Sequence, residues 1–247
     1  IYMVGTLKSA TDVLLTGCSA GGLATFLNAD RMGDEYFMDK SKFPAMKRYK
    51  AMPISGFFLD QKTVLGENYY PGYMKVIHDI SKAGVPTRCA AWIKEKYSKQ
   101  EDQEDNMYLC NFAENTISTA DTPIFFLNSA VDSWQMGNVF TDSAGSYGPW
   151  RSCAGNMEDN RCTNSTQIGQ IHDYEKVFEK SVEQQTAGGA LPGWRDDKPQ
   201  HGGFVHSCQT HCEGQDNWFW HNLTTRWDGQ EGVNVKMVDA FTAWWNA

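Results

Sequence analysis

Ser19 lies at the centre of the pentapeptide Gly17-Cys18-Ser19-Ala20-Gly21, which fits the pattern G-x-S-x-G. This pattern is typical of a nucleophile elbow, a strained strand-to-helix turn that exposes a serine hydroxyl for attack on an acyl carbon. Glycines two residues before and after the serine would leave room for the turn. The Ala20 N–H, at the start of the following helix, could donate to a developing oxyanion. A glycine-rich turn with an incidental serine is the alternative that so short a pattern leaves open.

A serine nucleophile needs a base, and the base needs a carboxylate that orients it. When a nucleophile elbow carries the serine, the acid follows a later strand and precedes the histidine in the chain. Asp132 comes shortly after the apolar run of residues 123–128 and is the favoured acid. Asp60 also follows a predicted strand and is the competitor. For either residue the alternative is a surface carboxylate or a helix cap.

Four of the six histidines come late enough in the chain to act as the base: His201, His206, His211 and His221. The other two, His78 and His172, fall in predicted helices and are interpreted as structural. His211 stands out because Cys208 and Cys212 flank it, and a short disulfide there would hold the imidazole in place. A loop histidine beside a structural bridge is the alternative.

The same segment contains residue types that bind zinc, namely His206, Cys208, His211 and Cys212. Their spacing, H-x-C-x₂-H-C, is more compressed than that of the usual zinc ligand pairs. Oxidising conditions would also favour a disulfide over a metal centre. We therefore predict that the protein uses no metal.

The seven cysteines fall into three local couples and one remainder. Spacing predicts the disulfides Cys89–Cys110, Cys153–Cys162 and Cys208–Cys212, with Cys18 free and buried behind an apolar strand. Two glycosylation sequons begin at Asn164 and Asn222. Paired cysteines and sequons together predict a secreted or cell-surface protein.

Composition narrows the function classes further. The 247 residues are 41% hydrophobic and 21% charged, which is ordinary for a globular protein. The net charge of −8 makes nucleic acid and anionic membrane poor candidates as partners. No apolar run approaches the ~18 residues that a membrane span needs.

The elements expected to position these residues alternate between strands and helices. Short apolar runs predict strands at residues 12–16, 49–55 and 123–128. Helical periodicity predicts helices at residues 21–31, 73–82, 168–185 and 235–245. Charge-rich or loop-like composition is found at residues 94–105, 141–164 and 187–203. The alternation predicts an α/β fold with a mostly parallel sheet covered by helices on both faces.

Several motifs, in this order along the chain, resemble the pectin acetylesterase and Notum family. They are GCSAGGLA at residues 17–24, the Asp30-Arg31 pair, SGFFLD at 55–60, LNSAVDSWQ at 127–135 and HSCQTHC at 206–212. The resemblance implies an α/β-hydrolase fold and a secreted serine carboxylesterase that needs no metal or other cofactor. It also implies Ser19 as nucleophile, Asp132 as acid and His211 as base. Some members remove acetyl groups from plant cell-wall pectin, and Notum removes a fatty acyl group from a protein.

One departure from the family concerns the region before Ser19. An α/β-hydrolase has several strands before its nucleophile, and the family carries a glycine-rich GGGW-type segment there that completes the oxyanion hole. Neither is present in this sequence. We therefore expect residues 1–247 to form the C-terminal portion of a single catalytic domain, completed by a second chain or a preceding segment of the same precursor.

The resulting prediction is an esterase that hydrolyses O-acyl esters, favouring O-acetyl groups on a polysaccharide, through an acyl-serine intermediate. Three alternatives remain. One is a catalytically silent structural glycoprotein of an extracellular or surface assembly. Another is a Notum-like deacylase of longer acyl chains. A serine peptidase on the same fold is disfavoured only by the resemblance.

Overall fold

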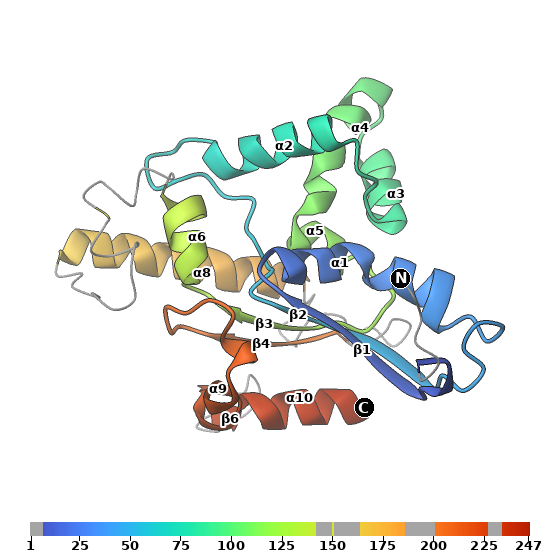
Figure 1. Ribbon diagram of the computed structural model, residues 1–247. Helices are drawn as coiled ribbons and strands as arrows, with labels where there is room; N and C mark the ends of the chain where they lie inside the picture. Colours follow the sequence, from blue (N-terminus) through green and yellow to red (C-terminus); the bar gives the residue numbers. More distant parts are fainter. Residues whose placement is uncertain (1–6, 142–149, 151–163, 186–200, 227–233) are drawn as a thin grey trace.

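A four-stranded sheet forms the centre of the protein in the computed structural model, which describes residues 7–141, 150, 164–185, 201–226 and 234–247 (Figure 1). The strand order is β1-β2-β3-β4, and every pairing is parallel. The strands are β1 Asp12–Cys18, β2 Arg48–Ile54, β3 Phe125–Ser129 and β4 Gly202–His206. Because parallel strands end at the same edge of a sheet, the residues that follow all four strands meet at one edge.

Helices cover both faces of this sheet (Figure 1). On one face lie α1 Ala20–Met32, α5 Ala113–Ile117 and α8 Ser165–Gln185, with α2 Tyr69–Ser81, α3 Thr87–Lys96 and α4 Gln100–Asn106 further out. On the other face lie α9 Asn217–Asn222 and α10 Met237–Asn246. The short helix α6 Ser133–Gln135 follows β3, and β5 Thr224–Arg226 pairs antiparallel with β6 Asn234–Lys236.

Strand β3 shows why both faces are apolar. All five of its residues are buried, and successive side chains enter different cores. The ring of Phe126 packs near Phe57 on the α1 face, with centroids 5.4 Å apart. The ring of Phe125 packs against Trp244 of α10, with centroids 5.2 Å apart. A strand buried on both faces is a continuous apolar run, which is why the sequence predicts it clearly.

The structure confirms the predicted α/β architecture and adds elements that the sequence did not indicate. The charge-rich stretch at residues 94–105 is helical for the most part, in α3 and α4. Most of the predicted loop at residues 187–203 lies outside the described residues, and its end is wrong, because Gly202 and Gly203 belong to β4. A Cβ on Gly203 would lie 2.5 Å from the ring of Phe126, so only glycine fits there. This requirement gives β4 a loop-like composition.

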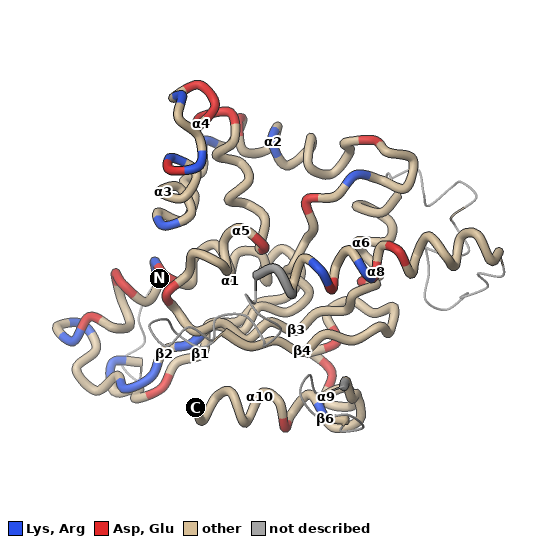
Figure 2. The backbone as a smooth tube through the Cα atoms, turned by 180° about the vertical axis from the view of Figure 1, so that it is seen from behind, with Lys and Arg blue, Asp and Glu red and all other residues tan. Residues whose placement is uncertain are grey.

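Charged residues are absent from two neighbouring strands of the sheet, β3 and β4. Figure 2 shows that α3 carries residues of both signs and α4 acidic residues, whereas β3 and β4 carry no Lys, Arg, Asp or Glu. Across the part of the chain that the structure describes, no helix combines the length and the apolar character needed to cross a membrane.

Candidate active site

Ser19 occupies the turn between β1 and α1. Its backbone has φ 58° and ψ −122°, a region that residues other than glycine rarely adopt. The turn is held by the Ser19 N–H, which donates to the Ile54 carbonyl at the end of β2 over 3.0 Å. Such strain, located where a strand passes into a helix, is the geometry of a nucleophile elbow.

Two glycines near Ser19 are required by close backbone contacts, but they are not the same two that the G-x-S-x-G pattern indicates. A Cβ on Gly17 would lie 2.5 Å from the Gly21 carbonyl oxygen, as the tight turn requires. A Cβ on Gly21 would meet nothing within 4 Å, so the prediction that this glycine avoids a collision is wrong. The next residue, Gly22, is the crowded one, because its Cβ would lie 2.3 Å from the Ile54 carbonyl oxygen. Gly22 lets α1 approach the end of β2.

Asp132 lies just beyond β3 and is fully buried. One carboxylate oxygen, Oδ1, accepts the backbone N–H groups of Trp134 and Gln135 at 2.9 and 3.0 Å, which caps α6. The other, Oδ2, lies 2.7 Å from Nδ1 of His211. Burial raises the pKa of Asp132, against the opposing effect of its hydrogen bond with His211. The cap and the histidine together fix both carboxylate oxygens.

His211 lies on the loop after β4, with its side chain 19% exposed. Burial lowers the pKa of its imidazole, but the hydrogen bond with Asp132 and the charges of Asp132 and Glu213 outweigh that effect, so the pKa is raised. A carboxylate on Nδ1 holds the proton there and leaves Nε2 free to accept another. No hydrogen bond joins Ser19 to His211 in the structure, and such contacts are often long in the absence of substrate.

The competing candidates lie elsewhere. Asp60 is exposed, and its backbone N–H contacts Glu114 rather than a histidine. His201 is buried just before β4, where its Nδ1 accepts the N–H of Ile124, the residue before β3. The structure therefore brings one predicted acid and one predicted base together, Asp132 with His211.

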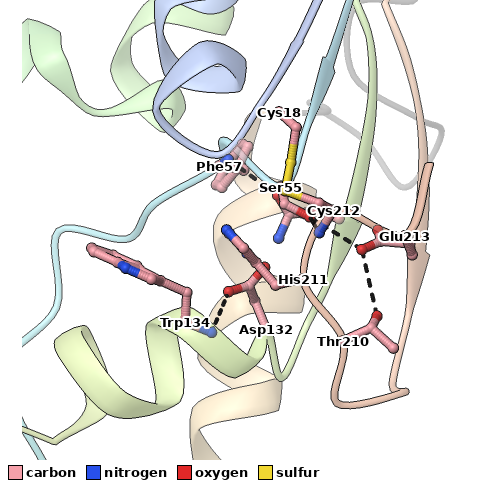
Figure 3. Close-up of a disulfide and its surroundings, with 10 residues drawn as sticks. Cys18, Ser55, Phe57, Asp132, Trp134, Thr210, His211, Cys212 and Glu213 are labelled. Atoms are coloured by element: carbon pink, nitrogen blue, oxygen red, sulfur yellow. Dashed lines mark hydrogen bonds and ion pairs between the residues drawn. A yellow bond between two sulfur atoms is a disulfide. The ribbon is translucent and has the colours of Figure 1, made fainter. Parts of the chain in front are cut away.

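The structure corrects the predicted disulfides at the site. Cys89 pairs with Cys110 as expected. Cys18, predicted to be free, is bonded to Cys212, and Cys208 is an exposed free thiol. The predicted Cys208–Cys212 bridge is therefore wrong. The observed bridge joins the residue before Ser19 to the residue after His211, across 194 positions of sequence (Figure 3). The disulfide therefore links the segment of the candidate nucleophile covalently to the segment of the candidate base.

Cys18, His211 and Cys212 have their potential ligand atoms within 4.8 Å of one another. The two sulfur atoms are bonded to each other, so neither is a thiolate. Thiolates are the form in which cysteines bind metals. In the disulfide form these residues could offer a metal only the imidazole.

The structure describes the two glycosylation sequons but not the third predicted disulfide. Cys153 and Cys162 lie outside the described residues. Asn164 and Asn222 are both exposed, the first just before α8 and the second at the end of α9.

A buried polar cluster behind His211 was not predicted from the sequence. Glu213 is 2% exposed, and its Oε2 accepts from the hydroxyls of Ser55 at 3.1 Å and Thr210 at 3.4 Å (Figure 3). Its Oε1 lies 3.2 Å from Nε2 of His206. Ser55 in turn accepts the Cys212 N–H at 2.9 Å. The one signal that the sequence offers is a carboxylate two residues after the candidate base His211.

Removing each of the two disulfides found among the described residues tests the observed pairing. We expect Cys18→Ser combined with Cys212→Ser to lower the free energy of unfolding by about 5 kcal/mol, because the bridge closes a very long loop in the chain-entropy account. Cys89→Ser combined with Cys110→Ser, the matched control, should cost about 3 kcal/mol. Urea denaturation measures both, and non-reducing peptide mapping that finds Cys208 joined to Cys212 would contradict the pairing.

A parallel sheet between helical layers, with a serine elbow after β1, an aspartate after β3 and a histidine after β4, defines an α/β-hydrolase-like fold. Among solved structures, the Wnt deacylase Notum from Drosophila shares this fold with a TM-score of 0.62. The two chains are 17% identical, and the match covers 94% of this chain and 53% of Notum.

The chain belongs to the Pectinacetylesterase family, whose model matches residues 2–246. Pectin acetylesterase 11 of Arabidopsis thaliana is 27% identical over 250 residues, covering 98% of this chain and 54% of that protein. Pectin acetylesterase 5 of the same plant is 28% identical over 225 residues, covering 89% and 44%. The chain thus spans about half the length of these relatives. The family resemblance drawn from the motifs is confirmed.

Proposed function

We propose that the chain carries the catalytic triad of a serine carboxylesterase, with Ser19 as nucleophile, His211 as base and Asp132 as acid. The observation that carries the proposal is the 2.7 Å contact between His211 Nδ1 and the fully buried Asp132. The Cys18–Cys212 disulfide in addition joins the loop that carries His211 to the strained turn at Ser19. Family membership supports the same assignment.

The proposed triad accounts for each proton transfer. Asp132 accepts the Nδ1–H of His211, so Nε2 can take the proton of the Ser19 hydroxyl as its oxygen attacks the ester carbonyl. The negative charge that develops on the carbonyl oxygen is stabilised by the N–H of Ala20, one of the first amides of α1, which lack an acceptor within the helix. His211 then protonates the leaving alcohol, and water hydrolyses the acyl-Ser19 intermediate by the same steps.

The proposed substrate is an O-acetyl ester on a polysaccharide. The support is indirect: relatives similar over nearly the whole chain are named pectin acetylesterases. The fold shared with Notum, a Wnt deacylase by name, makes longer acyl groups the second candidate.

We further propose that the protein is secreted and that residues 1–247 form the C-terminal portion of one catalytic domain. Two disulfides support an oxidising compartment. Exposed sequons at Asn164 and Asn222 fit the same route. Within the described residues, β1 pairs with a strand on one side only, which leaves an edge for further strands.

A series of p-nitrophenyl esters from acetyl to octanoyl tests the proposal and its substrate class. We expect the intact protein to hydrolyse the acetyl ester with the highest kcat/KM. A long apolar acyl channel would instead gain about 0.8 kcal/mol for each buried methylene, so kcat/KM would rise with chain length. A maximum at six or eight carbons would favour the longer-chain deacylase, and no turnover of any ester would contradict esterase activity.

A further inference from the structure

A buried carboxylate outside the proposed triad, that of Glu213, forms hydrogen bonds with the loop that carries His211. Glu213 is buried to 2% exposure and lies two residues after His211. Its Oε2 accepts from Thr210, the residue before His211, and from Ser55 at the end of β2. The carboxylate therefore links the residue before His211 to the end of β2.

We propose that Glu213 and Ser55 are positioning residues for His211: Ser55 fixes the loop, and the buried charge of Glu213 strengthens the imidazole as a base. This inference rests on the proposed esterase function. It assigns to Glu213 the role of a second carboxylate behind the base, in addition to Asp132.

Ser55 anchors the loop that carries His211 to the end of β2. Its hydroxyl accepts the N–H of Cys212 at 2.9 Å and donates to Glu213 Oε2 at 3.1 Å, so one oxygen joins two residues of the loop to β2. The backbone of Ser55 has φ 46°, and Cys212 has φ 65°. Two residues in the left-handed region face each other across this bridge, and such conformations persist only where surrounding contacts impose them.

His206, at the end of β4, faces the other carboxylate oxygen of Glu213. The Cys208 N–H donates to His206 Nδ1 at 3.2 Å. His206 Nε2 lies 3.2 Å from Glu213 Oε1, with angles outside those of a well-aligned hydrogen bond. The hydroxyls of Ser55 and Thr210, which donate to Oε2, stabilise the negative charge of the carboxylate.

That charge acts on His211. Burial tends to raise the pKa of Glu213, but the contact with His206 and the hydrogen bond from Ser55 lower it, so the group is ionised near neutral pH. Among the described residues, the charged groups that raise the pKa of His211 are Asp132, from the start of α6, and Glu213 on its own loop. A buried charge is weakly screened, so its effect should persist in salt.

The test compares three variants with the intact wild-type protein: Glu213→Gln, Ser55→Ala and Glu114→Gln. Glutamine keeps the shape of Glu213 and one acceptor oxygen for the hydroxyls of Ser55 and Thr210, but removes the charge. Ser55→Ala removes the bridge and keeps the charge. Glu114 is the matched control, because it is a partly buried carboxylate that accepts from Ser181 and lies outside the His211 site.

Two readouts are needed, the pH dependence of kcat/KM for p-nitrophenyl acetate and the NMR titration of the His211 imidazole. The acid limb of kcat/KM reports the protonation of the free base. Glu213→Gln should move that limb and the NMR midpoint to lower pH, because removing a negative charge destabilises the imidazolium. Ser55→Ala should reduce kcat/KM about tenfold or more through misplacement of the base, with a smaller change of midpoint. Glu114→Gln should change neither.

The outcomes separate this inference from the proposed function. Unmoved midpoints in Glu213→Gln, in a folded protein, would refute the electrostatic role. Full activity in Ser55→Ala would refute the positioning role. A wild-type protein that hydrolyses no ester, yet shows the NMR shift in Glu213→Gln, would refute esterase activity and leave the coupling to His211 standing.

Discussion

Replacing Ser19 by alanine is expected to lower kcat for p-nitrophenyl acetate by about 10⁶, as removal of the serine nucleophile does in subtilisin. The alanine keeps the Cβ and therefore adds no new clash at the strained turn, where φ is 58°. The loss should consequently be chemical rather than structural. Near-ultraviolet circular dichroism checks the fold, and a fluorophosphonate probe, which labels only an activated serine, should label the wild type and not the variant.

Ser118→Ala is the matched control for this experiment, since Ser118 is exposed and lies in the turn after α5. It should retain full activity and labelling. Turnover retained by Ser19→Ala would overturn the assignment of the nucleophile. A wild type that the probe does not label would favour the catalytically silent alternative.

Replacing Asp132 by asparagine is expected to lower kcat by about 10⁴, the effect of the same change in a serine protease triad. The asparagine oxygen can still accept the Trp134 and Gln135 N–H groups and cap α6. Its amide nitrogen would then face His211 Nδ1, which must give up its proton to accept this new donor. The proton would move to Nε2, where it blocks abstraction from Ser19.

Asp60→Asn is the control for Asp132→Asn, because Asp60 is the other carboxylate that the sequence offered as acid. We expect less than a threefold change in kcat for this variant, since Asp60 is exposed and contacts no histidine in the structure. If the two variants ranked in the opposite order, the acid would be wrongly assigned.

The elbow and the acid were predictable because their signals are local. The pattern around Ser19 needs only a strand before it and a helix after it, and Asp132 directly follows an apolar run buried on both faces. Strand β4 was missed for the opposite reason. Gly202 and Gly203 weaken a strand by themselves, and only the rings of Phe125 and Phe126 on the neighbouring strand explain them.

The disulfide at the site was mispredicted because spacing favours nearby cysteines. Cys208 lies close to Cys212 in sequence, whereas Cys18 lies 194 positions away. In the fold, the loop after β4 passes over the end of β2, where Ser55 holds the Cys212 N–H. This return path brings Cys212 to the end of β1. Such a path is a property of the assembled sheet and has no signature in the spacing of cysteines.

The long disulfide also determines how the protein responds to cleavage of its backbone. Because Cys18 and Cys212 are bonded, a single peptide-bond cut anywhere between them produces two fragments that remain one covalent molecule. Every loop between β1 and β4 lies inside this ring, so a nick in any of them leaves Ser19 and His211 joined. The ring therefore makes the pairing of nucleophile and base independent of an unbroken backbone between them.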